Sequence, residues 1–104
     1  MKNTVRMVQL AEQEMLDAAA YYEDRVDGLG RDFLDSIALA IKDIGDFPER
    51  WPVVRREVRR SLVSRFPYSL FYRVDPDEVI VLAVAHQRRR PAYWLGRLSR
   101  HGNQ

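Results

Sequence analysis

The sequence contains no cysteine. This absence excludes disulfide scaffolds, thiol nucleophiles and cysteine-ligated zinc sites, and it is typical of proteins kept in a reducing compartment. The chain also has no N-terminal segment with the apolar core of a secretory signal, and no run near the ~20 apolar residues that span a bilayer. We therefore expect a cytoplasmic protein with no membrane partner.

Motifs of well-known chemistry are also missing. The sequence has neither a phosphate-binding P-loop nor a Gly-x-Gly-x-x-Gly turn, and it lacks His-Glu-x-x-His and Gly-x-Ser-x-Gly. Two histidines are too few for a convincing metal site. We therefore expect no metal, no organic cofactor and no small-molecule cofactor partner.

Arginine is abundant and unevenly distributed. Only Lys2 and Lys42 are lysines, so every other strongly basic residue is arginine. Residues 1–50 hold six Lys/Arg against eleven Asp/Glu, a balance of −5, whereas residues 51–104 hold eleven against four, a balance of +7. Guanidinium groups bind phosphate and carboxylate through paired hydrogen bonds. The second half is therefore the candidate region for binding such a partner.

The length and a hydrophobic content of 46% predict one globular domain, residues 1–104. Its first segment, Val5–Leu10, is a short apolar run and predicts a strand. Apolar residues then recur at helical spacing over 11–26, and again from about residue 31 to the Gly45–Pro48 segment. The glycine-rich turn at 27–30 favours an antiparallel hairpin of two helices.

In the second half of the chain, the pattern of polar and apolar residues repeats every two positions. We expect a polar strand over residues 55–62, near a sheet edge. One face carries Arg56, Val58, Arg60 and Leu62, and the other carries Arg55, Glu57, Arg59 and Ser61. A proline-containing turn at 75–78 predicts a hairpin, and the second strand of that hairpin is apolar on both faces.

The tail from Pro91 to Arg100 predicts a short last helix. The full order is then β-α-α-β-β-β-α, which predicts an α+β fold with the helical hairpin packed on a small, mostly antiparallel sheet.

The segment His86–Trp94 has the richest cluster of functional side chains, since three arginines are followed by two aromatic residues. This combination can hold phosphates and offer flat rings for base stacking. The candidate catalytic or activity residues are Arg65, His86, Arg88, Arg89 and Tyr93. The candidate partner-binding residues are Arg56, Arg60, Arg73, Arg90 and Trp94. A plainer interpretation stays open, in which the arginines form a solvated face and the ring side chains pack or form internal hydrogen bonds.

Five motifs occur in order between about Leu10 and Arg97. They are Ala20-Tyr21-Tyr22-Glu23, Gly28-Leu29-Gly30 with Phe33-Leu34, Phe47-Pro48-Glu49-Arg50-Trp51-Pro52, Phe66-Pro67-Tyr68 with Tyr72-Arg73-Val74, and Ala83-Val84-Ala85-His86-x-Arg88-Arg89-x-Pro91-x-Tyr93-Trp94. Together they resemble the RelE/ParE superfamily of type II toxin–antitoxin toxins, in its ParE-like plasmid-stabilisation branch. The resemblance implies helices packed on a small antiparallel sheet, in agreement with the element order above.

The resemblance further implies a growth-inhibiting toxin that a cognate antitoxin neutralises. The superfamily has two activities on one fold. RelE-like members cut messenger RNA on the ribosome, whereas ParE-like members are associated with inhibition of DNA gyrase and have no known chemistry of their own. A third possibility is a degenerate toxin that only binds its antitoxin.

The RelE-like nuclease residues are matched only in part. Those nucleases have an arginine directly after the tyrosine that opens the third strand, and here Ser69 stands at that position. Arg88 falls on their arginine after the last strand, and Tyr93 or Trp94 lies near their C-terminal tyrosine. Because arginine cannot act as a general base at cellular pH, a metal-independent RNase would need His86 or Tyr93 to move protons. We therefore rank DNA gyrase ahead of messenger RNA as the target.

Overall fold

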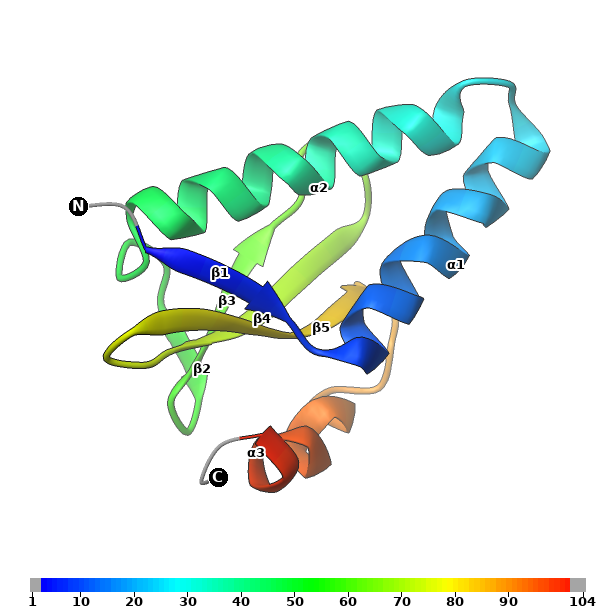
Figure 1. Ribbon diagram of the computed structural model, residues 1–104. Coiled ribbons are helices and arrows are strands. Elements are labelled where there is room, and N and C mark those ends of the chain that lie inside the picture. Colours follow the sequence, from blue (N-terminus) through cyan, green and yellow to red (C-terminus); the bar gives the residue numbers. More distant parts are fainter. Residues whose placement is uncertain (1–2, 102–104) are drawn as a thin grey trace.

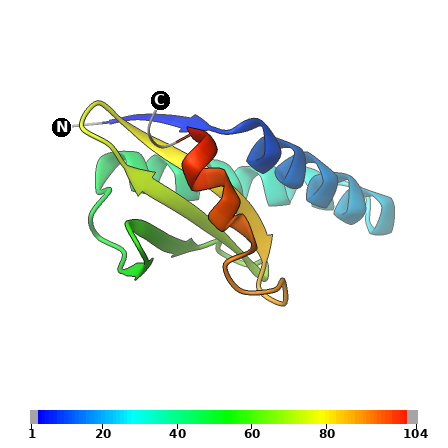
Figure 2. The same cartoon turned by 90° about the horizontal axis from the view of Figure 1, so that it is seen from below.

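The computed structural model describes residues 3–101 and contains a five-stranded sheet with helices on both faces (Figures 1 and 2). The strands are β1 (Thr4–Met7), β2 (Val53–Arg55), β3 (Val58–Leu62), β4 (Tyr68–Val74) and β5 (Glu78–His86). The helices are α1 (Gln9–Arg25), α2 (Leu29–Asp46), the 3-10 turn η1 (Tyr93–Leu95) and α3 (Gly96–His101). The strand order is β1-β5-β4-β3-β2, in which β1 runs parallel to β5 and every other pair is antiparallel. The predicted α+β class is confirmed.

A tight turn joins α1 to α2, as the glycines predict. Gly28 has a φ of 87°, in the left-handed region that glycine adopts without strain. The Glu23 carboxylate accepts hydrogen bonds from the Gly28 and Gly30 N–H groups at 2.9 and 3.0 Å, and so caps the first turn of α2. A Cβ at Gly30 would lie 2.6 Å from the Ala19 carbonyl oxygen. The two helices therefore approach each other more closely here than any larger residue allows.

The sheet lies between the two helical layers. Figure 2 shows α3 crossing the face of the sheet opposite α2. On the α2 side, the predicted apolar stripe of α2 is confirmed, because Phe33, Ile37 and Ile44 are all buried. The ring of Phe33 packs 5.0 Å from the ring of Tyr68 on β4. Residues 79–85 of β5 are all buried, as expected for a strand covered on both faces.

The prediction of one strand through residues 55–62 is wrong. The chain turns at Arg56 and Glu57, where Arg56 has a φ of 53°, and forms the hairpin of β2 and β3. Strand β2 is therefore the edge strand, and β3 lies inside the sheet. Val58 is fully buried while Leu62 is 58% exposed, so the expected common face is also not uniform. The two-residue alternation runs through this turn without glycine or proline, which is why the sequence pattern hides it.

The hairpin of β4 and β5 forms as predicted, and the Asp75 N–H donates to the Glu78 carbonyl at 2.8 Å to close it. The predicted last helix is present as η1 and α3, but it begins at Tyr93 rather than at Pro91. Ala92, with a φ of 58°, makes the sharp change of direction into η1. No helix within residues 3–101 is long and apolar enough to cross a membrane.

Candidate functional site

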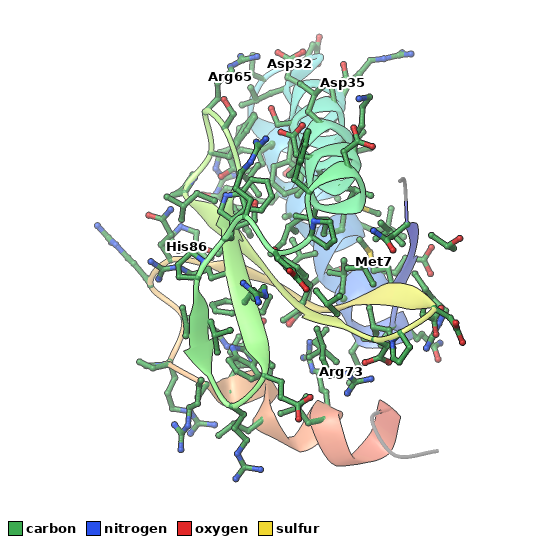
Figure 3. The ribbon with its side chains drawn as sticks, turned by 90° about the vertical axis from the view of Figure 1, so that its left-hand side faces the viewer. Met7, Asp32, Asp35, Arg65, Arg73 and His86 are labelled. Atoms are coloured by element: carbon green, nitrogen blue, oxygen red, sulfur yellow. The ribbon has the colours of Figure 1, made fainter. Side chains whose placement is uncertain are left out.

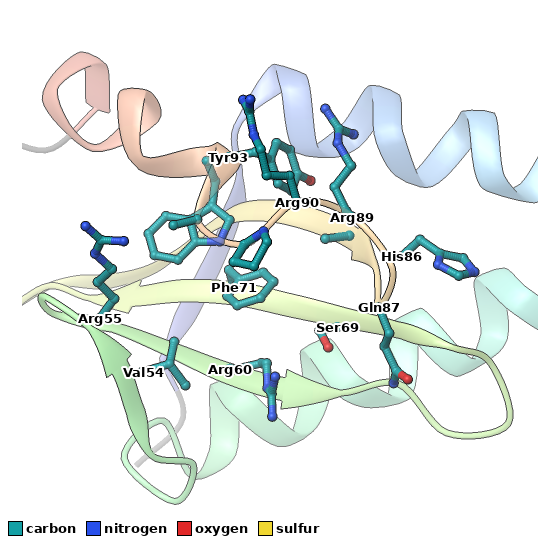
Figure 4. Close-up of a pocket in the computed structure, with 14 residues that line it drawn as sticks. Val54, Arg55, Arg60, Ser69, Phe71, His86, Gln87, Arg89, Arg90 and Tyr93 are labelled. Atoms are coloured by element: carbon teal, nitrogen blue, oxygen red, sulfur yellow. The ribbon is translucent and has the colours of Figure 1, made fainter.

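A pocket of about 280 Å³ opens between the β2–β3 hairpin and the loop that follows β5 (Figure 4). It gathers six of the ten predicted site residues, namely Arg60, His86, Arg89, Arg90, Tyr93 and Trp94. Arg55 joins them from β2. The picture shows Phe71 in the middle, with Arg55 and Arg60 on the hairpin side and Arg89 and Arg90 on the loop side. We call this site the basic pocket.

Strand register explains why these residues meet. Residues directly opposite each other in an antiparallel pair project to the same face of a sheet. Arg60 is opposite Phe71, and Phe71 is opposite Ala83, so the three share one face. The ring of Phe71 packs 5.2 Å from the ring of Trp94, which is 2% exposed and anchors the C-terminal segment on this face. The loop arginines are thereby held above the arginines of the hairpin.

Tyr93, a wall of the basic pocket, is tied to Glu14 of α1. Its hydroxyl donates to Glu14 Oε2 at 2.7 Å, and Arg97 donates to both oxygens of the same carboxylate at 3.0 Å. Burial raises the pKa of Tyr93 above its ordinary value, and the hydrogen bond and charge of Glu14 raise it further against the opposing Arg97 and Arg89. The Tyr93 hydroxyl is therefore a committed hydrogen-bond donor and is unsuited to act as a base.

Glu14 also binds the part of β5 that extends beyond its pairing with β1. Its Oε1 accepts the Val84 N–H at 3.0 Å, and Arg97 Nη1 donates to the Leu82 carbonyl at 2.9 Å. Burial lowers the pKa of Arg97, but the hydrogen bond and charge of Glu14 outweigh it and raise that pKa overall. One carboxylate thus joins α1, β5 and the segment that forms the loop side of the basic pocket.

His86 lies at the end of β5, on the rim of the basic pocket. Its Nδ1 accepts the Arg88 backbone N–H at 3.0 Å, and its ring packs edge-on against Tyr68 at 5.2 Å. An imidazole whose Nδ1 accepts a hydrogen bond carries its proton on Nε2 when it is neutral. Because Nε2 then already carries a proton and Nδ1 accepts the Arg88 N–H, neither ring nitrogen is free to take a proton from a substrate. This hydrogen bond therefore opposes a role for His86 as general base.

Four predicted site residues lie outside the basic pocket. Arg65 lies beside Asp32 of α2, with 3.7 Å between Nη2 and Oδ2, and Figure 3 shows this pair far from Arg73. Arg73 is 4% exposed and forms two hydrogen bonds with Asp75, at 2.7 and 3.0 Å. Its hydrogen bond with Asp75 raises the pKa of Arg73. Arg73 is therefore placed as a structural ion-pair residue.

The other two are Arg56 and Arg88, and both are exposed. Arg56 lies in the turn between β2 and β3, and Arg88 follows β5 and contributes its backbone N–H to His86. Neither lines the basic pocket. The cluster of arginines in the sequence therefore divides into residues that line the basic pocket and residues that do not.

Sequence reasoning missed Glu14, Arg97 and Arg55. Nothing in the spacing of Glu14 indicates contacts with residues about eighty positions later in the chain. Arg55 lies on the other side of the unpredicted turn from Arg60. Its place in the basic pocket could have been inferred only from that turn.

Solved structures that share the fold include two from toxin–antitoxin systems. One is a chain of the chromosomal ParDE toxin–antitoxin system from P. aeruginosa, with a TM-score of 0.68 and 18% identity, covering 82% of this chain and 96% of that chain. The other belongs to the toxin–antitoxin complex RelBE2 from Mycobacterium tuberculosis, with a TM-score of 0.57 and 23% identity, covering 83% and 99% of the two chains. At this identity the likeness establishes the fold, which is one found in toxin–antitoxin structures.

The sequence itself gives the family. It matches the family model described as "ParE toxin of type II toxin-antitoxin system, parDE" over residues 5–91, most of the chain. The protein therefore belongs to the ParE toxin family, which confirms the resemblance seen in the five motifs. No curated protein sequence matches the chain.

Proposed function

We propose that this protein is a growth-inhibiting toxin that acts by binding DNA gyrase and is neutralised by a cognate antitoxin. The observation that carries the choice of binding over catalysis is the state of the two side chains that could move protons. The Tyr93 hydroxyl donates to Glu14, and His86 Nδ1 accepts the Arg88 N–H. An endoribonuclease without a metal needs a base and an acid near the scissile phosphate, and these contacts oppose both candidates.

The antitoxin part of the proposal is supported by the family match and by both structural relatives, which come from toxin–antitoxin systems. The charge distribution agrees with it. The helical hairpin carries most of the acidic residues, whereas the basic pocket presents exposed arginines to a partner. A partner of opposite charge would be steered to this face during association.

Purified protein added to a DNA gyrase supercoiling reaction tests the proposed target. We expect supercoiling to fall as the protein is titrated in, and to recover when the antitoxin is added. Unchanged supercoiling at saturating protein would overturn the gyrase proposal.

Induction in cells separates the remaining alternatives. The ribosome-dependent endoribonuclease alternative predicts new 5′ ends in primer extension on transcripts, and their loss in Arg88→Ala. The degenerate-toxin alternative predicts unchanged growth when the chain is induced without its antitoxin. Our proposal predicts growth arrest without new 5′ ends.

A further inference from the structure

The basic pocket carries positive charge that the described part of the chain leaves unneutralised. Arg55, Arg60 and Arg90 line it, and within residues 3–101 the guanidinium group of none of the three has an ion-pair or hydrogen-bond partner. Arg89 is held partly by Glu14, with 4.0 Å between Nη1 and Oε2. Like charges that share one site favour a bound anion, because it removes their mutual repulsion.

The wall of the basic pocket also contains an unsatisfied donor. Trp94 is 2% exposed, and its indole Nε1 has no hydrogen-bond partner among the residues that the structure describes. Buried donors are almost always paired, and an unpaired one costs free energy that a bound acceptor recovers. Because the Nε1 atom is itself buried, an oxygen atom of a ligand in the pocket would satisfy this N–H once the side chains that cover it shift. The wall and the rim of the pocket thus favour the same kind of ligand atom.

The rings around the basic pocket are poorly placed for stacking a nucleic-acid base. Phe71 and Trp94 pack against each other, with centroids 5.2 Å apart and planes inclined by 30°. The guanidinium of Arg89 lies 3.9 Å from the centroid of Tyr93 and covers one face of that ring. Recognition of single-stranded RNA depends on free ring faces on which bases stack. These contacts therefore favour a polypeptide as the occupant.

The apolar lining also favours a carboxylate over a phosphodiester. Phe71, Ala85 and Pro91 contribute apolar surface to the same pocket as the arginines. An aspartate or glutamate side chain has a methylene stem behind its charge, which packs on such a surface, whereas a phosphodiester is polar on every side. The volume of about 280 Å³ is just below the ~300–1,000 Å³ typical of sites for whole small ligands. It suits one or two side chains.

We infer that the basic pocket is a carboxylate-binding site, which accepts an aspartate or glutamate side chain from an acidic segment of a protein partner. Arg55, Arg60 and Arg90 would pair with the carboxylate, and the indole N–H of Trp94 would donate to one of its oxygens. This inference rests on the proposed function, since it requires a partner protein such as the antitoxin.

The two tryptophans make a direct test possible. The isotope-labelled protein gives two indole N–H signals by NMR, and Trp51→Phe identifies the signal of Trp94. A blocked tetraglutamate peptide is titrated in, with a blocked tetraglutamine peptide as its uncharged match. We expect the glutamate peptide to move the Trp94 signal downfield, as a new hydrogen bond does, and the glutamine peptide to leave it unchanged.

Inorganic phosphate and hexauridylate distinguish the other sources of an anion. If either moves the Trp94 signal at a lower concentration than tetraglutamate, the pocket is a phosphate or nucleic-acid site and the inference is wrong. An unmoved Trp94 signal at the highest peptide concentration also contradicts it.

Substitutions locate the binding energy. Arg60→Gln and Arg90→Gln should each weaken peptide binding about tenfold, the value of one charge-assisted contact. Arg65→Gln is the matched control, because it removes an arginine outside the basic pocket, and it should change binding less than about twofold. Equal losses in all three variants would mean that only overall charge is sensed. These titrations use the protein alone, so their failure is separate from a failure of the gyrase assay.

Discussion

The hydroxyl of Tyr93 and the carboxylate of Glu14 are 2.7 Å apart, although 79 positions separate them in the chain. This hydrogen bond joins the first helix to the segment that forms one side of the basic pocket. Arg97 donates to the same carboxylate, and the side chains of Arg97 and Glu14 are only 13% and 18% exposed. The position of the pocket arginines in the loop therefore depends on a contact between the first helix and a segment that follows the last strand.

Replacing Glu14 should destabilise the protein. Glu14→Ala leaves Arg97 as an uncompensated, mostly buried charge and removes the acceptor for the Val84 N–H. We expect a loss of about 3 kcal/mol in the free energy of unfolding, measured by urea denaturation. Glu12 is an exposed residue of α1, two positions before Glu14. The free energy of unfolding of Glu12→Ala should stay within about 0.5 kcal/mol of that of the parent protein. Similar losses in both variants would contradict the role of Glu14.

Alkaline pH should weaken the fold through buried phenols. Burial raises the pKa of Tyr72 from 10.0 to about 12, and burial with Glu14 raises that of Tyr93. Since the unfolded chain then loses these protons first, stability is complete below about pH 10 and falls as the pH rises above it.

The free energy of unfolding measured at about pH 9 and about pH 11 tests this pH dependence. Tyr93→Phe should reduce the loss between the two values, whereas Tyr21→Phe, which changes an exposed ring, should not. A pH dependence that is identical in Tyr93→Phe and the parent protein would refute the assignment.

The helical hairpin should not tolerate a methyl group at Gly30. Gly30→Ala places a Cβ 2.6 Å from the Ala19 carbonyl oxygen and 2.9 Å from Glu23 Cβ. Overpacking of this kind costs about 1–3 kcal/mol. Gly96→Ala is the control, because a Cβ there meets nothing within 4 Å and the residue has helical φ and ψ. Thermal unfolding should show a lower midpoint for the first variant and an unchanged or higher midpoint for the second.

The pocket arginines should control neutralisation by the antitoxin. Arg60→Gln combined with Arg90→Gln removes two guanidinium groups that have no partner in the described chain. We expect antitoxin affinity to fall about a hundredfold, which is about tenfold for each charge-assisted contact. Isothermal titration with the purified antitoxin measures this. An affinity as high as that of Arg65→Gln would show that the antitoxin does not use the basic pocket.

The elements that could be predicted from sequence are those whose signal is local. The helical hairpin follows from apolar spacing and Gly28, and the β4–β5 hairpin follows from the turn at Asp75 and Pro76. The β2–β3 turn was missed because Arg56 adopts a positive φ without glycine, so the strand pattern continues through it. A turn can be predicted from sequence only when it contains residue types typical of turns, such as glycine, proline or asparagine.

The part of the candidate site that could be predicted is likewise the part made of residues close together in sequence. The loop arginines and Trp94 are consecutive in sequence, and their clustering after β5 was visible. The assignment of Arg73 to partner binding did not anticipate its ion pair with Asp75, two residues away and across the start of a turn. The contribution of Glu14 is a tertiary contact between distant segments, and no spacing in one sequence encodes it.

The gyrase supercoiling reaction is the most direct test of whether this toxin acts by binding gyrase, as we propose, rather than by cutting RNA. We expect the purified protein to inhibit supercoiling in a dose-dependent way, and equimolar antitoxin to restore it. Supercoiling that is unaffected by saturating protein, together with new transcript ends in cells that express it, would show that the protein cuts RNA and does not act on gyrase.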